Sequence, residues 1–133
     1  ARLLRAGRFD LLDIENIAEE IEDVGKAEQR ELMSRMAVLL AHLLKWQYQP
    51  ERRGKSWRLT IRIQRREVVS VFDETPSLKA RLTDAKWWQR VWDKALAQTI
   101  NETGLVDFPE VCPWTFAEII DESWLPDQQN GRE

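Results

Sequence analysis

The chain has 133 residues, 43% of them hydrophobic and 32% charged, with a formal net charge of −3 at pH 7. This balance excludes a disordered chain, and the longest apolar run falls far short of the roughly 20 residues that a membrane-spanning helix needs. The length predicts one domain built on one hydrophobic core.

The first predicted element is a long helix that begins at Ile14, with Asp13 as its N-cap, and ends at Gln49-Pro50. Its apolar residues stay in one helical phase throughout, and Gly25 is the one weak point. The stripe comprises Ile14, Ile17, Ala18, Ile21, Val24, Leu32, Met36, Leu39, Leu43 and Trp46. This pattern favours a single helix, or two stacked coaxially.

The second predicted helix follows a short loop and has Ser56 as its N-cap. Residues 57–63 also alternate between apolar and polar, which is typical of a strand, but only the helical phase extends to Phe72. In the helix the buried face comprises Trp57, Ile61, Val68, Val71 and Phe72. Leu59 and Ile63 remain on a further side, so we expect that side to contact another helix or another subunit.

Three more helices are predicted in the second half of the chain. A short one begins at Leu78 after Thr75-Pro76-Ser77, and a long one runs from Asp84 to about Thr103 and stops at Gly104. The long one has Trp88, Val91, Trp92, Ala95, Leu96 and Thr99 on its apolar stripe, with Trp87 pointing elsewhere. Residues 115–118 have the spacing of a capping box before a short last helix.

These elements predict an all-α fold, a single-domain irregular bundle of three long and two short helices. We expect the domain to cover residues 1–125 and residues 126–133 to form a C-terminal tail.

Several segments match one known family in order and spacing. The most specific are HLLKWQYQP at 42–50 and CPW at 112–114. With these the chain resembles the bacterial family catalogued as domain of unknown function twenty-nine. The resemblance covers nearly the whole chain and implies a compact helical fold, with no established activity, ligand or catalytic residue. Members of that family usually carry an upstream helix rich in aromatic residues, in line with the missing initiator methionine here.

The residue content argues against the common catalytic centres, so we expect no catalytic residues, metal or cofactor. His42 is the only histidine, which excludes a di-iron carboxylate bundle, and neither a nucleophile-elbow serine nor a glycine-rich phosphate loop is present. The single cysteine, Cys112, cannot form a thiolate metal site or an internal disulfide, and residues 1–13 contain no export signal, so we expect a cytoplasmic protein. The acidic residues of the first helix spread over several faces, which favours a solvated surface. They are Glu15, Glu19, Glu20, Glu22 and Asp23.

A polar column runs along one flank of the first helix, since Glu28, Arg35 and His42 recur every seven residues. Neighbours in this column are about 10 Å apart and cannot bond each other, so each needs partners on other helices. We favour satisfied structural residues; the alternative is a cleft in which His42 titrates as an enzyme's base.

Residues 45–66 carry eight cations against one anion, Glu51, for a net charge of +7. The cations are Lys45, Arg52, Arg53, Lys55, Arg58, Arg62, Arg65 and Arg66. With Trp57 and Tyr48 nearby, this segment could track a phosphate backbone and stack bases. Arg58, Arg62 and Arg65 or Arg66 form a basic stripe on one side of the predicted second helix. The competing interpretation, which we favour, is that this stripe pairs with Glu15, Glu19 and Glu22 of the first helix inside the bundle, because nucleic-acid binders usually show a basic excess and the acidic and basic totals of this chain nearly cancel.

Two functions from different classes therefore remain, and an enzyme with a cleft around His42 is a distant third. The first is a non-catalytic helical module that binds another protein, or itself, through the side marked by Leu59, Ile63 and Trp87. The second is a nucleic-acid-binding protein that uses residues 45–66.

Overall fold

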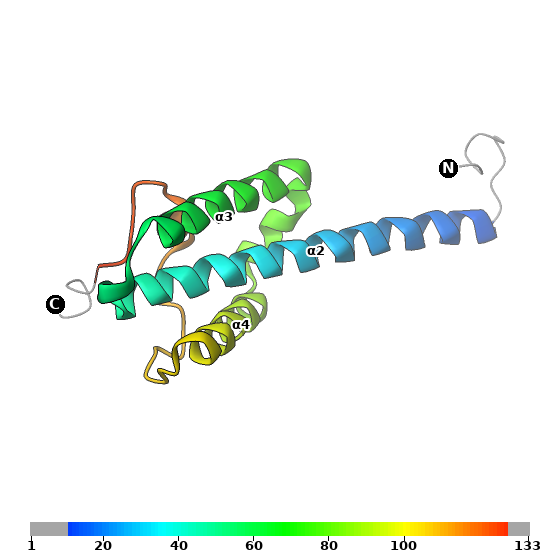
Figure 1. The fold of residues 1–133 in the computed structure, drawn as a ribbon. Helices are drawn as coiled ribbons and strands as arrows, with labels where there is room; N and C mark the ends of the chain where they lie inside the picture. The colour runs from blue at the N-terminus through cyan, green and yellow to red at the C-terminus, as the bar shows by residue number, and fades with distance from the viewer. Residues whose placement is uncertain (1–10, 128–133) are drawn as a thin grey trace. The chain divides into compact units, whose positions relative to one another are not determined.

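The computed structural model describes residues 11–127, and side chains from residue 25 onward. The elements in chain order are α2 (Leu11–Tyr48), η1 (Pro50–Arg52), α3 (Lys55–Glu74), η2 (Pro76–Thr83), α4 (Ala85–Thr103) and α5 (Phe116–Ile120) (Figure 1). No strand occurs between residues 11 and 127, so the all-α prediction is confirmed and residues 57–63 are helical.

Helix α2 crosses the boundary between two compact units, residues 1–31 and residues 32–133. In the first unit, residues 11–31 form the N-terminal stretch of α2. The helix passes through Gly25 without a break, as the unbroken apolar phase predicts. Asp13 lies inside the helix, so the prediction that it is the N-cap is wrong; an acidic residue suits the first turn as well as the cap, because both positions face the positive end of the helix dipole.

In the second unit, the rest of α2 lies between α3 and α4, which flank it on opposite sides (Figure 1). Leu39 and Leu43, from the predicted stripe, are fully buried, but so are Leu40 and Leu44 beside the stripe and Ala41 opposite it. A helix that is apolar all round is typical of a central position in a bundle. The core is therefore built around residues 32–46 of α2, with partners from both neighbouring helices.

Helix α3 begins at Lys55, with Gly54 as N-cap and no side-chain cap bond, so the predicted cap at Ser56 is wrong. Four of the five predicted core residues are buried: Ile61, Val68, Val71 and Phe72. Trp57 is half-buried at the edge of this face. One buried residue was not predicted to be in the core: Arg65 is only 2% exposed.

The next two elements differ in how well the sequence predicts them. The short helix begins at Pro76 rather than Leu78 and is a 3-10 helix. Helix α4 begins at Ala85, one residue after the predicted start, and Asp84 is its N-cap: the Asp84 carboxylate accepts hydrogen bonds from the backbone N–H groups of Lys86 and Trp87, at 3.0 and 3.2 Å. It ends at Gly104, whose φ of 78° is a left-handed conformation that glycine adopts without strain.

The C-terminal part of the chain is held by caps and aromatic rings. The predicted capping box of α5 is present, with Thr115 and Glu118 each accepting from the other's backbone N–H. Trp114 contacts the rings of Trp92 and Trp124 edge to face, with centroids 5.6 and 5.8 Å apart. These contacts attach the irregular segments on both sides of α5 to α4. Most of the predicted tail, residues 128–133, lies outside the described residues.

Candidate functional site

Lys45, the first cation of the basic segment, is committed to the bundle. Its ammonium group donates to Glu102 of α4 at 2.5 Å and lies 5.7 Å from the centroid of the Trp57 ring. The residue is buried, so the pair is screened less by solvent than a surface salt bridge. Lys45 holds the pKa of the Glu102 carboxyl below its usual value. Lys45 therefore links α2 to α4 instead of facing a ligand.

Two arginines cover the buried Trp46 ring. The Arg53 and Arg58 guanidinium groups lie 5.1 and 4.9 Å from its centroid. Arg53 also donates to the Trp46 carbonyl at 2.6 Å. These are cation–π contacts, which are worth more where the ring is shielded from water. The two guanidinium groups therefore cover the indole ring of Trp46.

Arg65 lies in the core of the second unit. Its guanidinium donates to the backbone carbonyls of Ile119 at 2.7 Å and Trp124 at 2.5 Å. Burial lowers the pKa of Arg65, while the neighbouring Asp121 and Glu122 carboxylates raise it. Arg65 thus satisfies the carbonyls at the end of α5 and in the following segment, and its role is structural.

The last cation of the segment, Arg66, pairs with Glu122 on the surface at 2.9 Å. The favoured sequence interpretation paired the basic stripe with Glu15, Glu19 and Glu22, whose side chains lie outside the described residues. Within residues 25–127 the carboxylate that pairs with this stripe comes from the C-terminal segment instead.

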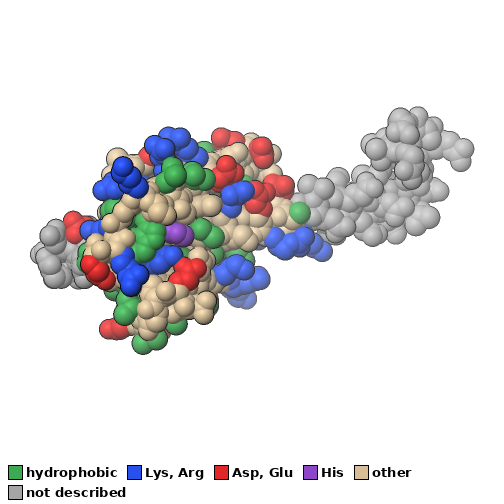
Figure 2. Space-filling model, viewed as in Figure 1, with side chains coloured by type: hydrophobic (Ala, Val, Ile, Leu, Met, Phe, Trp, Pro, Cys, Tyr) green, Lys and Arg blue, Asp and Glu red, His purple; other side chains and the backbone are tan. Residues whose placement is uncertain are grey.

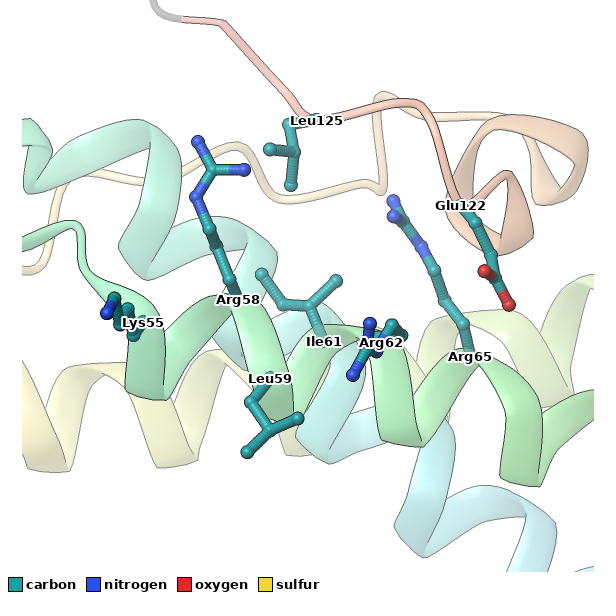
Figure 3. Close-up of a pocket in the computed structure, with 8 residues that line it drawn as sticks. All are labelled: Lys55, Arg58, Leu59, Ile61, Arg62, Arg65, Glu122 and Leu125. Carbon is teal, nitrogen blue, oxygen red and sulfur yellow. The ribbon is translucent and has the colours of Figure 1, made fainter.

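A groove of about 420 Å³ remains between α3 and the segment after α5. We call it the α3 groove. It is lined by Lys55, Arg58, Leu59, Ile61, Arg62, Arg65, Glu122 and Leu125. Arg58 and Arg65 extend toward the segment that carries Leu125, whereas Leu59 points away from it (Figure 3). The sequence did not predict that Glu122 and Leu125 belong to this groove, because they lie in an irregular segment without periodicity.

The extra apolar side predicted for the bundle is present on α3 but does not include Trp87. Leu59 and Ile63 are 49% and 45% exposed. Over α3, lysine and arginine side chains border hydrophobic ones on the surface (Figure 2). Trp87 is buried in the core and contacts the Trp88 ring at 5.5 Å. The prediction that Trp87 points away from the core is therefore wrong.

The predicted polar column does not line the α3 groove. Arg35 contacts α3, donating to Gln64 at 3.4 Å and pairing with Glu67 at 3.5 Å, as expected for a structural residue. His42 bonds its own helix through Nδ1 and the Val38 carbonyl, 2.9 Å apart, rather than another helix. Glu28 is half-buried in the first unit.

Comparison with known proteins identifies the family. A family model described as "Domain of unknown function DUF29" matches residues 1–125. The chain belongs to this family. No curated protein and no solved structure matches it.

Membership of the DUF29 family fits the observed helical fold and assigns no activity. Among residues 25–127 no cluster of histidine, cysteine and carboxylate side chains could hold a metal ion. None of the helices, over the residues described, is both long and apolar enough to cross a membrane. The function must therefore be argued from the surfaces of the second unit.

The pKa of His42 predicts how the stability of the fold depends on pH. Burial lowers its pKa from 6.5, the hydrogen bond to Val38 raises it, and Lys45 and Glu102 act in opposite directions. Because protonation is disfavoured in the folded state, the unfolded chain binds the proton more readily as the pH falls. We expect the free energy of unfolding to decrease as the pH falls from neutral through 6.5.

Urea denaturation at a series of pH values measures this effect. His42→Gln should flatten the dependence over this range, since the chain has one histidine. Lys45 lowers the pKa of Glu102, so the contribution of Glu102 to the free energy of unfolding is lost only below pH 4.5, the usual pKa of a glutamate. The effects of His42 and Glu102 therefore fall in different pH ranges. A wild-type stability that does not change through pH 6.5 would show that His42 is not desolvated in solution.

Proposed function

We propose that this chain is a helical protein-interaction module that binds an acidic, amphipathic helix of a partner protein across the outer face of α3. The observation that carries the proposal is the exposure of Leu59 and Ile63 beside a row of cations. Large apolar side chains grouped on a surface and rimmed by polar ones are typical of interaction sites. As the sequence suggested, we place the module in the bacterial cytoplasm.

The apolar part of this surface has the spacing that another helix can use. Leu59 and Ile63 are four residues apart, so they lie on one face of α3, one turn from each other. Ridges of residues spaced by four are those that interdigitate when two helices pack. A partner helix with leucine or isoleucine at matching positions can bury these side chains.

The charges beside these residues specify an acidic partner. Lys55, Arg58 and Arg62 are exposed, and none has an ion-pair partner among residues 25–127. Arg66 is already paired with Glu122. Complementary charges at an interface raise the association rate and exclude partners of the wrong sign. Carboxylates flanking the apolar residues of the partner are the complement of this pattern.

A protein partner fits better than a nucleic acid, because the aromatic rings near the basic segment already have contacts within the fold. Tyr48 contacts Phe108 edge to face, with centroids 5.0 Å apart. Trp57 lies beside Lys45, and Trp46 is buried. Binding of single strands relies on exposed aromatic faces as well as cations. Five of the eight cations also have partners within the fold: Lys45, Arg53, Arg65 and Arg66 through hydrogen bonds or ion pairs, and Arg58 through the Trp46 ring.

A labelled synthetic helix tests the proposal. The probe carries leucines four residues apart, flanked by glutamates, and is titrated against the full chain by fluorescence anisotropy. We expect saturable binding that weakens with salt. Replacing Leu59 and Ile63 together with serine should weaken it at least about tenfold, or ~1.4 kcal/mol. Val106→Ser, at a residue 74% exposed in the loop after α4, is the matched control and should leave binding unchanged.

Three further measurements distinguish the alternatives. The same helix with lysine in place of glutamate should not bind; equal binding of both forms would contradict the charge argument. A single-stranded RNA that binds more tightly than the acidic helix, regardless of Leu59 and Ile63, would favour the nucleic-acid alternative. Light scattering shows whether the same double substitution breaks up a self-association, in which case the partner is a second copy of this chain.

A further inference from the structure

A second hollow, of about 500 Å³, lies where the first half of α4 meets the loop leading into α5. We call it the aromatic hollow. It is lined by Leu82, Thr83, Ala85, Trp88, Gln89, Trp92, Val111, Cys112, Trp114 and Phe116. None of these residues belongs to the α3 groove, so a ligand in the hollow would be independent of a partner bound at α3. The volume lies within the range of about 300–1,000 Å³ that is usual for small-molecule sites.

The aromatic walls of the hollow support one another. Trp92 contacts Trp114 edge to face at 85°, and Trp88 contacts Phe116 at 70°, with centroids 6.3 Å apart in the second pair. Trp92 is fully buried, which anchors the first pair in the core. Edge-to-face contacts fix the orientation of rings because the positive edge of one meets the negative face of the other. The hollow is therefore formed before any ligand arrives.

Two of the three indole groups at the hollow already have hydrogen-bond partners in the protein. The Trp88 Nε1–H donates to the Leu82 carbonyl at 2.8 Å, and the Trp92 Nε1–H donates to the Pro109 carbonyl at 2.9 Å. A ligand that needed these donors would have to break an existing bond. Two of the aromatic walls therefore offer a guest apolar contact rather than hydrogen bonds.

Thr83, Gln89 and Cys112 also have hydrogen-bond partners in the protein, and none of the lining residues carries a formal charge. The Gln89 amide donates to the Glu110 carbonyl at 3.0 Å. Cys112 donates from Sγ to the Trp114 carbonyl at 3.6 Å, and burial raises the pKa of the thiol to about 11, so it stays protonated and neutral. Without a countercharge, an ionic guest would lose its hydration without compensation.

We infer that the aromatic hollow is a binding site for a small, neutral, aromatic molecule. The walls recognise the guest by ring contacts and shape, and the satisfied polar groups select against guests that must hydrogen-bond. Burial of apolar ring surface supplies the affinity.

A matched pair of dyes tests the inference on the full chain. N-phenyl-1-naphthylamine is neutral, and anilinonaphthalene sulfonate has the same rings with a negative charge. We expect the neutral dye to bind saturably at one site per chain and at least about tenfold more tightly than the sulfonate. Ala85→Phe, at an exposed lining residue, fills the hollow and should weaken the neutral dye at least about tenfold. Leu59→Ser in the α3 groove should leave its affinity unchanged.

The single cysteine gives an independent readout that needs no substitution. Cys112 lines the hollow, so a saturating concentration of the neutral dye should slow its reaction with a small thiol reagent. This measurement decides the matter if Ala85→Phe does not fold. Tighter binding of the sulfonate, or an unchanged rate at Cys112 with the dye bound, would overturn the inference. Loss of dye binding in Leu59→Ser but not in Ala85→Phe would move the site to α3.

Discussion

Replacing Arg65 with alanine is expected to lower the free energy of unfolding by about 3–5 kcal/mol. The substitution removes a buried guanidinium and leaves the Ile119 and Trp124 carbonyls without the donor that now reaches them from α3. An unpaired buried carbonyl keeps its full desolvation cost. Since a domain of this size is stable by about 5–15 kcal/mol, the loss is a large fraction of the total. Urea denaturation followed by circular dichroism measures it.

Two variants separate the geometry of Arg65 from its charge. Arg65→Lys keeps a cation but replaces a planar fork with a single ammonium group, which cannot occupy both donor positions, so we expect an intermediate loss. Arg66→Ala removes the adjacent arginine, which is exposed and paired with Glu122, and should change stability little. If Arg65→Ala behaved like Arg66→Ala, water would be replacing the guanidinium at the two carbonyls.

The position of Arg65 marks the limit of what helical periodicity can predict. Helical periodicity placed Arg65 correctly on the second predicted helix but assigned it to a basic stripe rather than to the core, because arginine is usually exposed. Its acceptors are the backbone carbonyls of Ile119 and Trp124, which follow Arg65 in the sequence by 54 and 59 positions. Any residue can supply such a carbonyl, so the sequence carries no signal of the pairing.

The helices themselves were predictable because their signals are local. Gln49-Pro50 ends α2, Asp84 caps α4 and Gly104 stops it, each through the backbone preference of one or two residues. The misplaced starts of α3 and η2 have a common cause, since two residues suited to capping stand close together at each of them: Gly54 and Ser56 before α3, and Thr75 and Ser77 before η2. Gly54 rather than Ser56 precedes α3. Sequence alone does not rank neighbouring caps that differ by fractions of a kcal/mol.

The candidate site was predicted in part. Periodicity predicted exposure correctly on α3 but not on α4, and the two helices differ in how much of their surface is covered by neighbours. Leu59 and Ile63 fell outside the core stripe of α3 and are exposed, as a helix packed on one face allows. Trp87 fell outside the stripe of α4, yet it is buried with Val91 because the buried arc of α4 is wider than one stripe. The width of that arc depends on tertiary packing, which a helical wheel does not contain.

Trp92→Ala is expected to have an effect as large as that of Arg65→Ala, a loss of about 3–5 kcal/mol. Trp92 is fully buried, and the substitution leaves a cavity that the surrounding helices can fill only in part. It also removes the donor to the Pro109 carbonyl and the edge-to-face partner of Trp114. The irregular segment between α4 and α5 should loosen along with the core. Urea denaturation followed by circular dichroism, which does not depend on the tryptophan removed, gives the change.

Trp92→Phe divides this loss between packing and the hydrogen bond. Phenylalanine keeps an aromatic ring against Trp114 but has no N–H for the Pro109 carbonyl, so it should retain much of the stability that alanine loses. Hydrogen exchange adds a local test, because residues 105–114 should lose protection in both variants if the indole bond holds this loop. Normal protection there in Trp92→Ala would mean that the loop is fixed by contacts other than the indole, and that the wall formed by Trp114 stands without it.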